Sequence, residues 1–249
     1  MKINLLAVGI ISTIMIGSIA YAITVGVEPP VSYINNLKNC TKSTITEKGN
    51  SIQEYTIKGM LPNGRCEVYI SSYTNFADSK VYEGYKTMAH AFSQMANDIG
   101  KDKSKQITDA DIPTQAQMIE QGIKEKDEMI CKFSNNERKA LISAYQKHDS
   151  KNPPAKIENG SISFSFDSSK MSSYDNLMLT LSDGVCQSPN DPNGKSKKYA
   201  CEYADTTCYV TKYEKGFSSF KCTNNRDVSF KMMDTIEKHI SQGMCEQIF

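Results

Sequence analysis

The sequence predicts an α+β fold of short antiparallel sheets and packed helices, cross-linked by disulfides. It further suggests two halves that arose by internal duplication. Three observations lead to this prediction. An apolar N-terminal run precedes a body that carries all eight cysteines. Short segments alternate apolar and polar residues between turn signals, as strands do, and other segments repeat apolar residues at helical spacing.

The N-terminal run has the parts of a secretory signal peptide. Lys2 supplies a short positive region, residues 5–19 are apolar, and Ala-Tyr-Ala at 20–22 offers the small-x-small pattern of a cleavage site. We predict a signal peptide at residues 1–22, with an uncleaved anchor at residues 5–27 as the alternative. Both interpretations export the body, as a periplasmic or secreted protein or as one anchored in the membrane by this segment with its body outside.

The cysteines predict a disulfide framework. An even number in an oxidising compartment favours full pairing, although the sequence alone leaves about a hundred connectivities open. A polar, proline-containing stretch at residues 147–156 separates three cysteines from the other five, so full pairing requires at least one bridge between the halves. The candidate bridging residues are Cys40, Cys66, Cys131, Cys186, Cys201, Cys208, Cys222 and Cys245.

The first half is predicted to be one α+β module at residues 31–148. Residues 75–128 are expected to be a helical insertion within it. Its elements are, in order, a helical turn at 31–37, strands at 51–58 and 66–73 around an Asn-Gly turn, helices at 85–99 and 113–126, a strand at 129–133, and a helix that begins with a capping box from Ser134 to Glu137.

The second half is predicted to be a cysteine-rich α+β module at residues 157–249. Its final helix begins near Asp227 and carries apolar residues at helical spacing. Four tyrosines in its last part are expected to pack on a sheet: Tyr199, Tyr203, Tyr209 and Tyr213. Alternating patterns and a turn signal predict strands at 161–166, 177–181, 198–203, 208–213 and 217–222, with a turn at 191–194.

The two halves match in the order of their cysteines, which predicts an internal duplication. Val68 and Val210 each follow the middle cysteine of their half by two residues. If the duplication is real, Cys201 and Cys245 are additions to the second copy and are the candidate mutual pair. The matched cysteines are Cys40, Cys66 and Cys131 in the first half and Cys186, Cys208 and Cys222 in the second.

Charge and motif content exclude several function classes. The chain has 29 basic and 28 acidic residues, and loss of the leader removes only Lys2, so the body is formally neutral. Nucleic acid is bound through excess positive charge and is not an expected partner. The one local basic group, Lys195 with Lys197 and Lys198, lies in a turn-rich stretch and is interpreted as a solvated loop.

No catalytic, cofactor or metal site is predicted. The sequence contains no Gly-x-Ser-x-Gly, His-Glu-x-x-His or glycine-rich phosphate motif, and no Cys-x2-Cys pair for zinc or thiol redox chemistry. His148 and His239 lie late in predicted helices, where a cationic side chain is favourable. His90 lies near methionines at helical spacing, which indicates packing rather than copper binding.

Three short motifs follow one another in the first half: Gly64-Arg65-Cys66, then Cys131-Lys132-Phe133, then Glu137-Arg138 at the start of a helix. Their order resembles that in small secreted cysteine-bearing bacterial proteins of unassigned function, over roughly residues 33–148. The resemblance implies a compact exported module and carries no active site to transfer. The long gap between the second and third cysteines departs from the compact pattern.

Together these observations favour an exported, disulfide-stabilised structural or binding module of the cell envelope, with an unidentified protein or envelope component as its partner. One alternative is a secreted hydrolase whose site is assembled from distant residues, such as His148 or His239 with carboxylates. Another is a secreted inhibitor or effector. An enzymatic activity is the less favoured interpretation because no catalytic motif supports it.

Overall fold

The structure is a computed structural model, and it describes residues 29–99, 107–147, 155–158, 161–164, 173–189, 196–204, 206–214, 218–223 and 229–249. The predicted signal peptide or anchor, the predicted turn at 191–194 and His148 lie outside the described residues.

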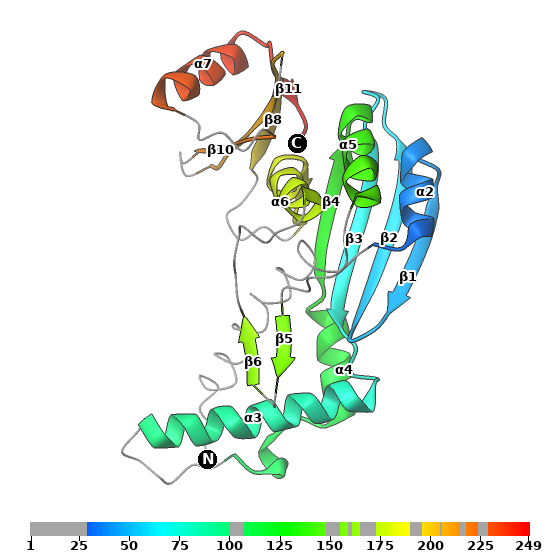
Figure 1. The fold of residues 1–249 in the computed structure, drawn as a ribbon, viewed down its shortest axis with the longest axis vertical. Coiled ribbons are helices and arrows are strands. Elements are labelled where there is room, and N and C mark those ends of the chain that lie inside the picture. The colour runs from blue at the N-terminus through cyan, green and yellow to red at the C-terminus, as the bar shows by residue number, and fades with distance from the viewer. Residues whose placement is uncertain are drawn as a thin grey trace. The chain divides into compact units, whose positions relative to one another are not determined.

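The chain is confirmed as an α+β protein (Figure 1). Its helices are α2 (Val31–Asn39), α3 (Ser79–Ile99), α4 (Gln115–Lys124), α5 (Asn135–Gln146), α6 (Ser173–Val185) and α7 (Phe230–Ser241), with a 3-10 turn η1 at Asp109–Asp111. Its strands are β1 (Ser43–Lys48), β2 (Ser51–Met60), β3 (Cys66–Thr74), β4 (Asp127–Phe133), β5 (Ala155–Glu158), β6 (Ser161–Phe164), β7 (Cys186–Gln187), β8 (Lys197–Glu202), β9 (Thr207–Lys212), β10 (Ser218–Cys222) and β11 (Glu246–Gln247).

The strands form three sheets. The largest has the order β1-β2-β3-β4-β7, the second has the order β10-β9-β8-β11, and β5 pairs with β6. In the second sheet β8 pairs antiparallel with β9 and with β11, and β9 pairs antiparallel with β10. The two-residue strand β7 lies at the edge of the largest sheet, where it pairs antiparallel with β4.

Contacts divide the described residues into two compact units. One contains Thr46–Glu54 and Ser71–Asp127, and the other contains residues 29–45, Tyr55–Ile70 and the described part of Glu128–Phe249. The larger unit holds most of the largest sheet's apolar face together with the second sheet.

In the larger unit, helices α2 and α5 cover one face of the largest sheet (Figure 1). Alternate residues of β2 and β3 are buried, as expected for strands with one face against a core. Leu37 of α2 and Leu141 of α5 belong to the same buried cluster as Ile57, Val68 and Phe133 of the strands. This core is the reason why the alternating segments of the first half form a sheet.

The predicted strand at 177–181 is wrong, because this segment lies in helix α6. Leu177, Leu181 and Val185 recur at every fourth residue, and the last two are buried in the main core. Gly184 allows α6 to approach β9 closely, since a Cβ added there would lie 2.3 Å from Cγ of Tyr209. Packing against the sheets therefore decides a segment whose short apolar pattern is ambiguous.

A second, smaller core lies between the second sheet and α7. It contains Cys201, Cys208, Val210, Cys222 and Ile236. The predicted stripe of the last helix is confirmed in its described part, because Met232 and Ile240 pack against this cluster and Ile236 is fully buried. The three predicted strands before this helix correspond to β8, β9 and β10.

The smaller unit contains the predicted helical segment. Helix α3 begins at Ser79, earlier than the apolar pattern indicates, because Oδ1 of Asp78 accepts a hydrogen bond from the Lys80 amide. The hydroxyl of Tyr82 donates a hydrogen bond to the carbonyl oxygen of Pro113. The side-chain amide of Gln115 in α4 donates to the carbonyl oxygen of Phe76. These bonds tie α3 to the segment before α4, and α4 to the segment before α3.

None of the described helices is both long enough and apolar enough to cross a membrane. The strands β1, β5, β7 and β11 were not predicted from the sequence. Two of these, β7 and β11, have only two residues each, which is too short for an alternating pattern to be visible.

Candidate functional site

The structure forms four disulfides: Cys40–Cys66, Cys131–Cys186, Cys201–Cys245 and Cys208–Cys222. Full pairing is confirmed, as is a bridge between the halves, which is Cys131–Cys186. The predicted pair Cys201–Cys245 is also confirmed. The pairing scheme does not repeat between the halves, because the first half joins its first two matched cysteines whereas the second joins its last two. The structure does not show the duplication.

Two of the bridges join residues that face each other on neighbouring strands. Cys131 of β4 is the register partner of Cys186 of β7, and Cys208 of β9 is the partner of Cys222 of β10. The first of these bridges fixes the edge strand of the largest sheet. Lys132 and Gln187, the residues that follow its two cysteines, line a cavity described below.

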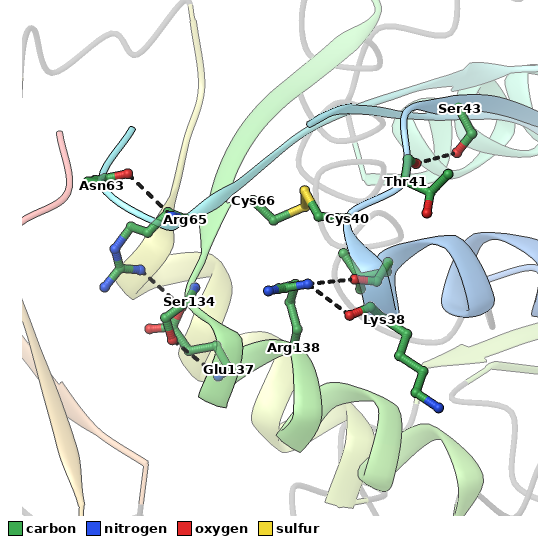
Figure 2. Close-up of a disulfide and its surroundings, with 11 residues drawn as sticks. Lys38, Cys40, Thr41, Ser43, Asn63, Arg65, Cys66, Ser134, Glu137 and Arg138 are labelled. Atoms are coloured by element: carbon green, nitrogen blue, oxygen red, sulfur yellow. Dashed lines mark hydrogen bonds and ion pairs between the residues drawn. A yellow bond between two sulfur atoms is a disulfide. The ribbon is translucent and has the colours of Figure 1, made fainter. Parts of the chain in front are cut away.

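Arg65 occupies the end of the tight turn between β2 and β3. The amide of Leu61 donates to the carbonyl oxygen of Arg65 at 2.7 Å, and the amide of Gly64 donates to that of Leu61 at 2.9 Å. Gly64 has φ +78°, a left-handed conformation that favours glycine. The turn thereby places the Arg65 side chain next to the N-terminus of α5 (Figure 2).

The Arg65 guanidinium is buried and surrounded by acceptors. Its Nε and Nη2 atoms donate to the two carboxylate oxygens of Glu246, each at 2.7 Å. Its Nη1 donates to Oε2 of Glu137 at 3.0 Å and to the carbonyl oxygen of Lys132 at 2.8 Å. This fork-like pairing is the geometry in which arginine binds a carboxylate most strongly.

Glu137 is the third residue of α5 and serves two purposes. Its Oε2 accepts from the Ser134 amide at 2.6 Å, which completes the predicted capping box. Its Oε1 accepts from the hydroxyl of Tyr209 in β9 at 2.7 Å. We call Arg65, Glu137, Tyr209 and Glu246 the Arg65 cluster.

The surroundings of Arg65 and Tyr209 favour the protonated form of both side chains. Burial by itself lowers the pKa of Arg65, but the hydrogen bond to Glu246 and the attraction of Glu137 outweigh it, so the pKa is raised overall. Burial, followed by the charge of Glu137, raises the pKa of the Tyr209 hydroxyl well above its usual range. Tyr209 is therefore a fixed hydrogen-bond donor, and the cluster links the β2–β3 turn, α5, β9 and β11.

Arg138, the neighbour of Glu137, binds the end of α2. Its Nη1 donates to the carbonyl oxygens of Lys38 at 2.8 Å and Leu37 at 3.3 Å (Figure 2). A cation is favourable at these carbonyls because they lie at the negative, C-terminal end of the helix dipole. The segments Gly64–Cys66, Cys131–Phe133 and Glu137–Arg138 are thus brought together near the Cys40–Cys66 bridge.

An open cavity of about 710 Å³ lies beside the edge strand β7 and the strands β8, β9 and β11. Three lysines line it: Lys132 of β4, Lys197 of β8 and Lys212 of β9. Phe249 supplies an aromatic surface, and Ser196 supplies a hydroxyl. We call this site the lysine cavity.

The lysine cavity has polar groups that its walls satisfy only in part. Lys132 Nζ donates to the carbonyl oxygen of Ile248 at 3.1 Å and lies 4.0 Å from the centroid of the Phe249 ring. Lys212 Nζ lies 3.7 Å from Oε1 of Glu237. Ser196 is 5% exposed, and its hydroxyl has no hydrogen-bond partner among the described residues.

The interpretation of the basic group as a solvated loop is wrong for Lys197 and Lys198, whereas Lys195 lies outside the described residues. Lys197 and Lys198 begin β8, and Lys198 is buried. Its Nζ donates to the carbonyl oxygens of Asp183 and Cys186, at the C-terminal end of α6. Successive side chains of a strand point to opposite faces, so Lys197 lines the cavity and Lys198 reaches the end of α6.

The described histidines do not form a site with several acidic groups. His90 contacts Oδ1 of Asp109 at 2.8 Å and the carbonyl oxygen of Ile107 at 3.2 Å, which ties α3 to η1. His239 Nδ1 lies 3.1 Å from the Tyr203 hydroxyl. Among the described residues no group of three or more histidine, cysteine or acidic side chains is placed to hold a metal ion.

Comparison of the chain with family models, curated proteins and solved structures finds no match.

The sequence did not indicate the lysine cavity, since Lys132 comes from a strand far along the chain from the consecutive strands β8 and β9 that carry Lys197 and Lys212. The Arg65 cluster had a partial signal, because the capping box predicted the position of Glu137 in α5. Nothing in the sequence indicated that Glu246 would meet Arg65, which lies 181 positions earlier.

Proposed function

We propose that this protein is an exported binding module of the cell envelope, in which disulfide-linked sheets hold the lysine cavity open for a small ligand. The four disulfides are consistent with an oxidising, extracytoplasmic location. A binding role is supported by a single contrast. The Arg65 cluster pairs its charged groups with one another, whereas the lysine cavity is lined by three lysines and by Ser196, whose buried hydroxyl has no hydrogen-bond partner among the described residues.

The dimensions of the cavity support a small molecule rather than a macromolecular groove. Ligand sites in proteins commonly enclose about 300 to 1,000 Å³ and combine apolar surface with a few polar groups. The cavity falls within this range and has both kinds of surface. Its walls come from strands that Cys131–Cys186 and the β8–β9 pairing hold in register, so the site is formed before a ligand binds.

A ligand screen tests the proposal. The oxidised protein would be incubated with anionic, neutral and cationic small molecules, and its Tm would be measured with each. Gln247→Trp places a large side chain in the cavity wall, and Gln242→Trp changes the same residue type at an exposed site outside it. We expect Gln247→Trp alone to abolish the ligand-induced rise in Tm. Absence of any shift with all three charge classes would overturn the binding role.

The location is tested by mass spectrometry without reduction on protein recovered from its host. Export with cleavage predicts a chain that starts at Ile23 and carries the four bridges described above. Retention of Met1 would instead indicate the anchored form. Recovery of the eight cysteines as free thiols would contradict an oxidising location.

A further inference from the structure

We propose that the ligand of the lysine cavity is a small organic anion, held by the ammonium groups of Lys132, Lys197 and Lys212 and by the hydroxyl of Ser196. This inference rests on the proposed binding function and specifies the chemistry of its ligand. The first reason is the register of the second sheet. Lys197 of β8 and Lys212 of β9 are direct partners across an antiparallel pair.

Residues that face each other in this way point to the same side of the sheet, and two like charges there destabilise the pairing. Glu237 offsets only part of this repulsion, because it lies 3.7 Å from Lys212 and both side chains are partly exposed. An anion between the two ammonium groups would replace the repulsion by attraction. The register therefore favours a negatively charged occupant.

The second reason is the Ser196 hydroxyl. A hydroxyl that is buried without a hydrogen-bond partner is unfavourable, and folded proteins rarely retain one. Ser196 is one of the residues that line the cavity, and its hydroxyl oxygen is buried. An anion can accept a hydrogen bond from a hydroxyl and from ammonium groups at the same time.

The third reason is the balance of the lining. Among the described residues that line the cavity, Glu214 carries an acidic side chain and three residues are lysines. Lys132 uses one of the three N–H donors of its ammonium group for the Ile248 carbonyl oxygen. Phe249 adds an apolar wall, and the volume far exceeds that of an inorganic anion. A ligand with an anionic head and an organic body matches this lining.

Phenyl phosphate is a suitable probe because it combines both parts. Its Kd would be measured by calorimetry on the oxidised full chain, beside benzyl alcohol, benzylamine and inorganic phosphate. We expect phenyl phosphate to bind most tightly, and we expect its affinity to fall as salt is added. Lys197→Gln or Lys212→Gln should weaken it about tenfold, whereas Lys139→Gln, at an exposed site in α5, should leave the Kd unchanged.

A second measurement separates binding from folding. Lys197→Glu converts the like-charge pair into an opposite-charge pair, so we expect the Tm of the unliganded protein to rise while phenyl phosphate binding is lost. A fall in Tm together with retained binding would overturn the inference. Equal binding of benzylamine, or of inorganic phosphate, would overturn it while leaving a binding module intact. No binding of any probe or screened compound would overturn the binding module itself.

Discussion

The Arg65 cluster and the lysine cavity both contain charged side chains and a hydroxyl group. In the cluster these groups bind one another, whereas in the cavity they are only partly paired. In the cluster, Glu137 and Glu246 are bonded to Arg65 by direct hydrogen bonds of 3.0 Å or less. In the cavity, Lys197 faces Lys212 across two strands, and a buried hydroxyl has no partner among the described residues. Both regions lie in the larger unit, and Lys132 takes part in each.

The contrast separates a stabilising role from a binding role. Charges that are buried and mutually paired fix the positions of the segments that carry them, and removing one partner is strongly destabilising. Charges that face an open space do not hold the fold together, so they can be changed with little effect on stability. Each prediction below tests one side of this contrast.

The largest effect is expected from Arg65→Met. The substitution leaves the buried Glu137 carboxylate without its cationic partner and should lower the free energy of unfolding by about 3–5 kcal/mol. Lys197→Met, in the cavity, should change it by no more than about 0.5 kcal/mol. Chemical denaturation of both variants measures the difference. Equal effects of the two substitutions would mean that the cluster is not a stabilising centre.

Loss of the Cys131–Cys186 bridge should have the next largest effect. Replacing both cysteines by serine opens a loop of 55 residues, for which chain entropy predicts a loss of about 4 kcal/mol. The same change at Cys208–Cys222 opens a loop of 14 residues and should cost about 3 kcal/mol. Only the first change should also weaken ligand binding, because its cysteines precede cavity residues. Weaker binding in both variants would contradict this.

Tyr209→Phe removes a hydrogen bond to a charged group and should cost about 1.5–3 kcal/mol at neutral pH. The pKa of Tyr209 is higher in the folded than in the unfolded state, so its contribution is complete below about pH 10 and is lost as the pH rises above it. The difference between the variant and the wild type should therefore shrink in alkaline urea denaturation. Tyr199→Phe serves as the control, and a constant difference would exclude this linkage.

Gly184→Ala should destabilise the protein by about 1–3 kcal/mol, since the added methyl group overlaps the Tyr209 side chain. Gly84→Ala makes the same change in helix α3, where a Cβ meets nothing within 4 Å, and should raise stability by up to about 1 kcal/mol. Thermal denaturation compares the two variants. A stabilising Gly184→Ala would mean that α6 does not pack directly on β9.

Much of the local structure could be predicted from the sequence. The Asn-Gly turn, the capping box before α5 and the apolar stripe of α7 are local signals, and each lies within a few residues of the element that it specifies. The α6 segment was mispredicted because Leu177 and Leu181 fit a strand or a helix equally well over five residues. Its helical state is accompanied by the approach of Gly184 to Tyr209, which no local pattern contains.

The candidate site could be predicted only in fragments. Glu137 was placed correctly at the start of its helix, but its contacts with Arg65 and Tyr209 join segments 72 positions apart in each direction. The lysines near 197 were misinterpreted as a loop because β8 is paired only through the β9 register and the short strand β11.

By itself, the sequence determined the fold class, the pairing of all eight cysteines, a bridge between the halves and most of the helices and strands. These depend on composition, counting and short-range periodicity. Tertiary structure decided the pairings other than Cys201–Cys245, the burial of Arg65 beside two carboxylates, and the register that places Lys197 opposite Lys212. The physical reason is that burial and strand register are set by contacts between segments distant in the chain, and these contacts determine whether a charged side chain finds a partner or faces a cavity.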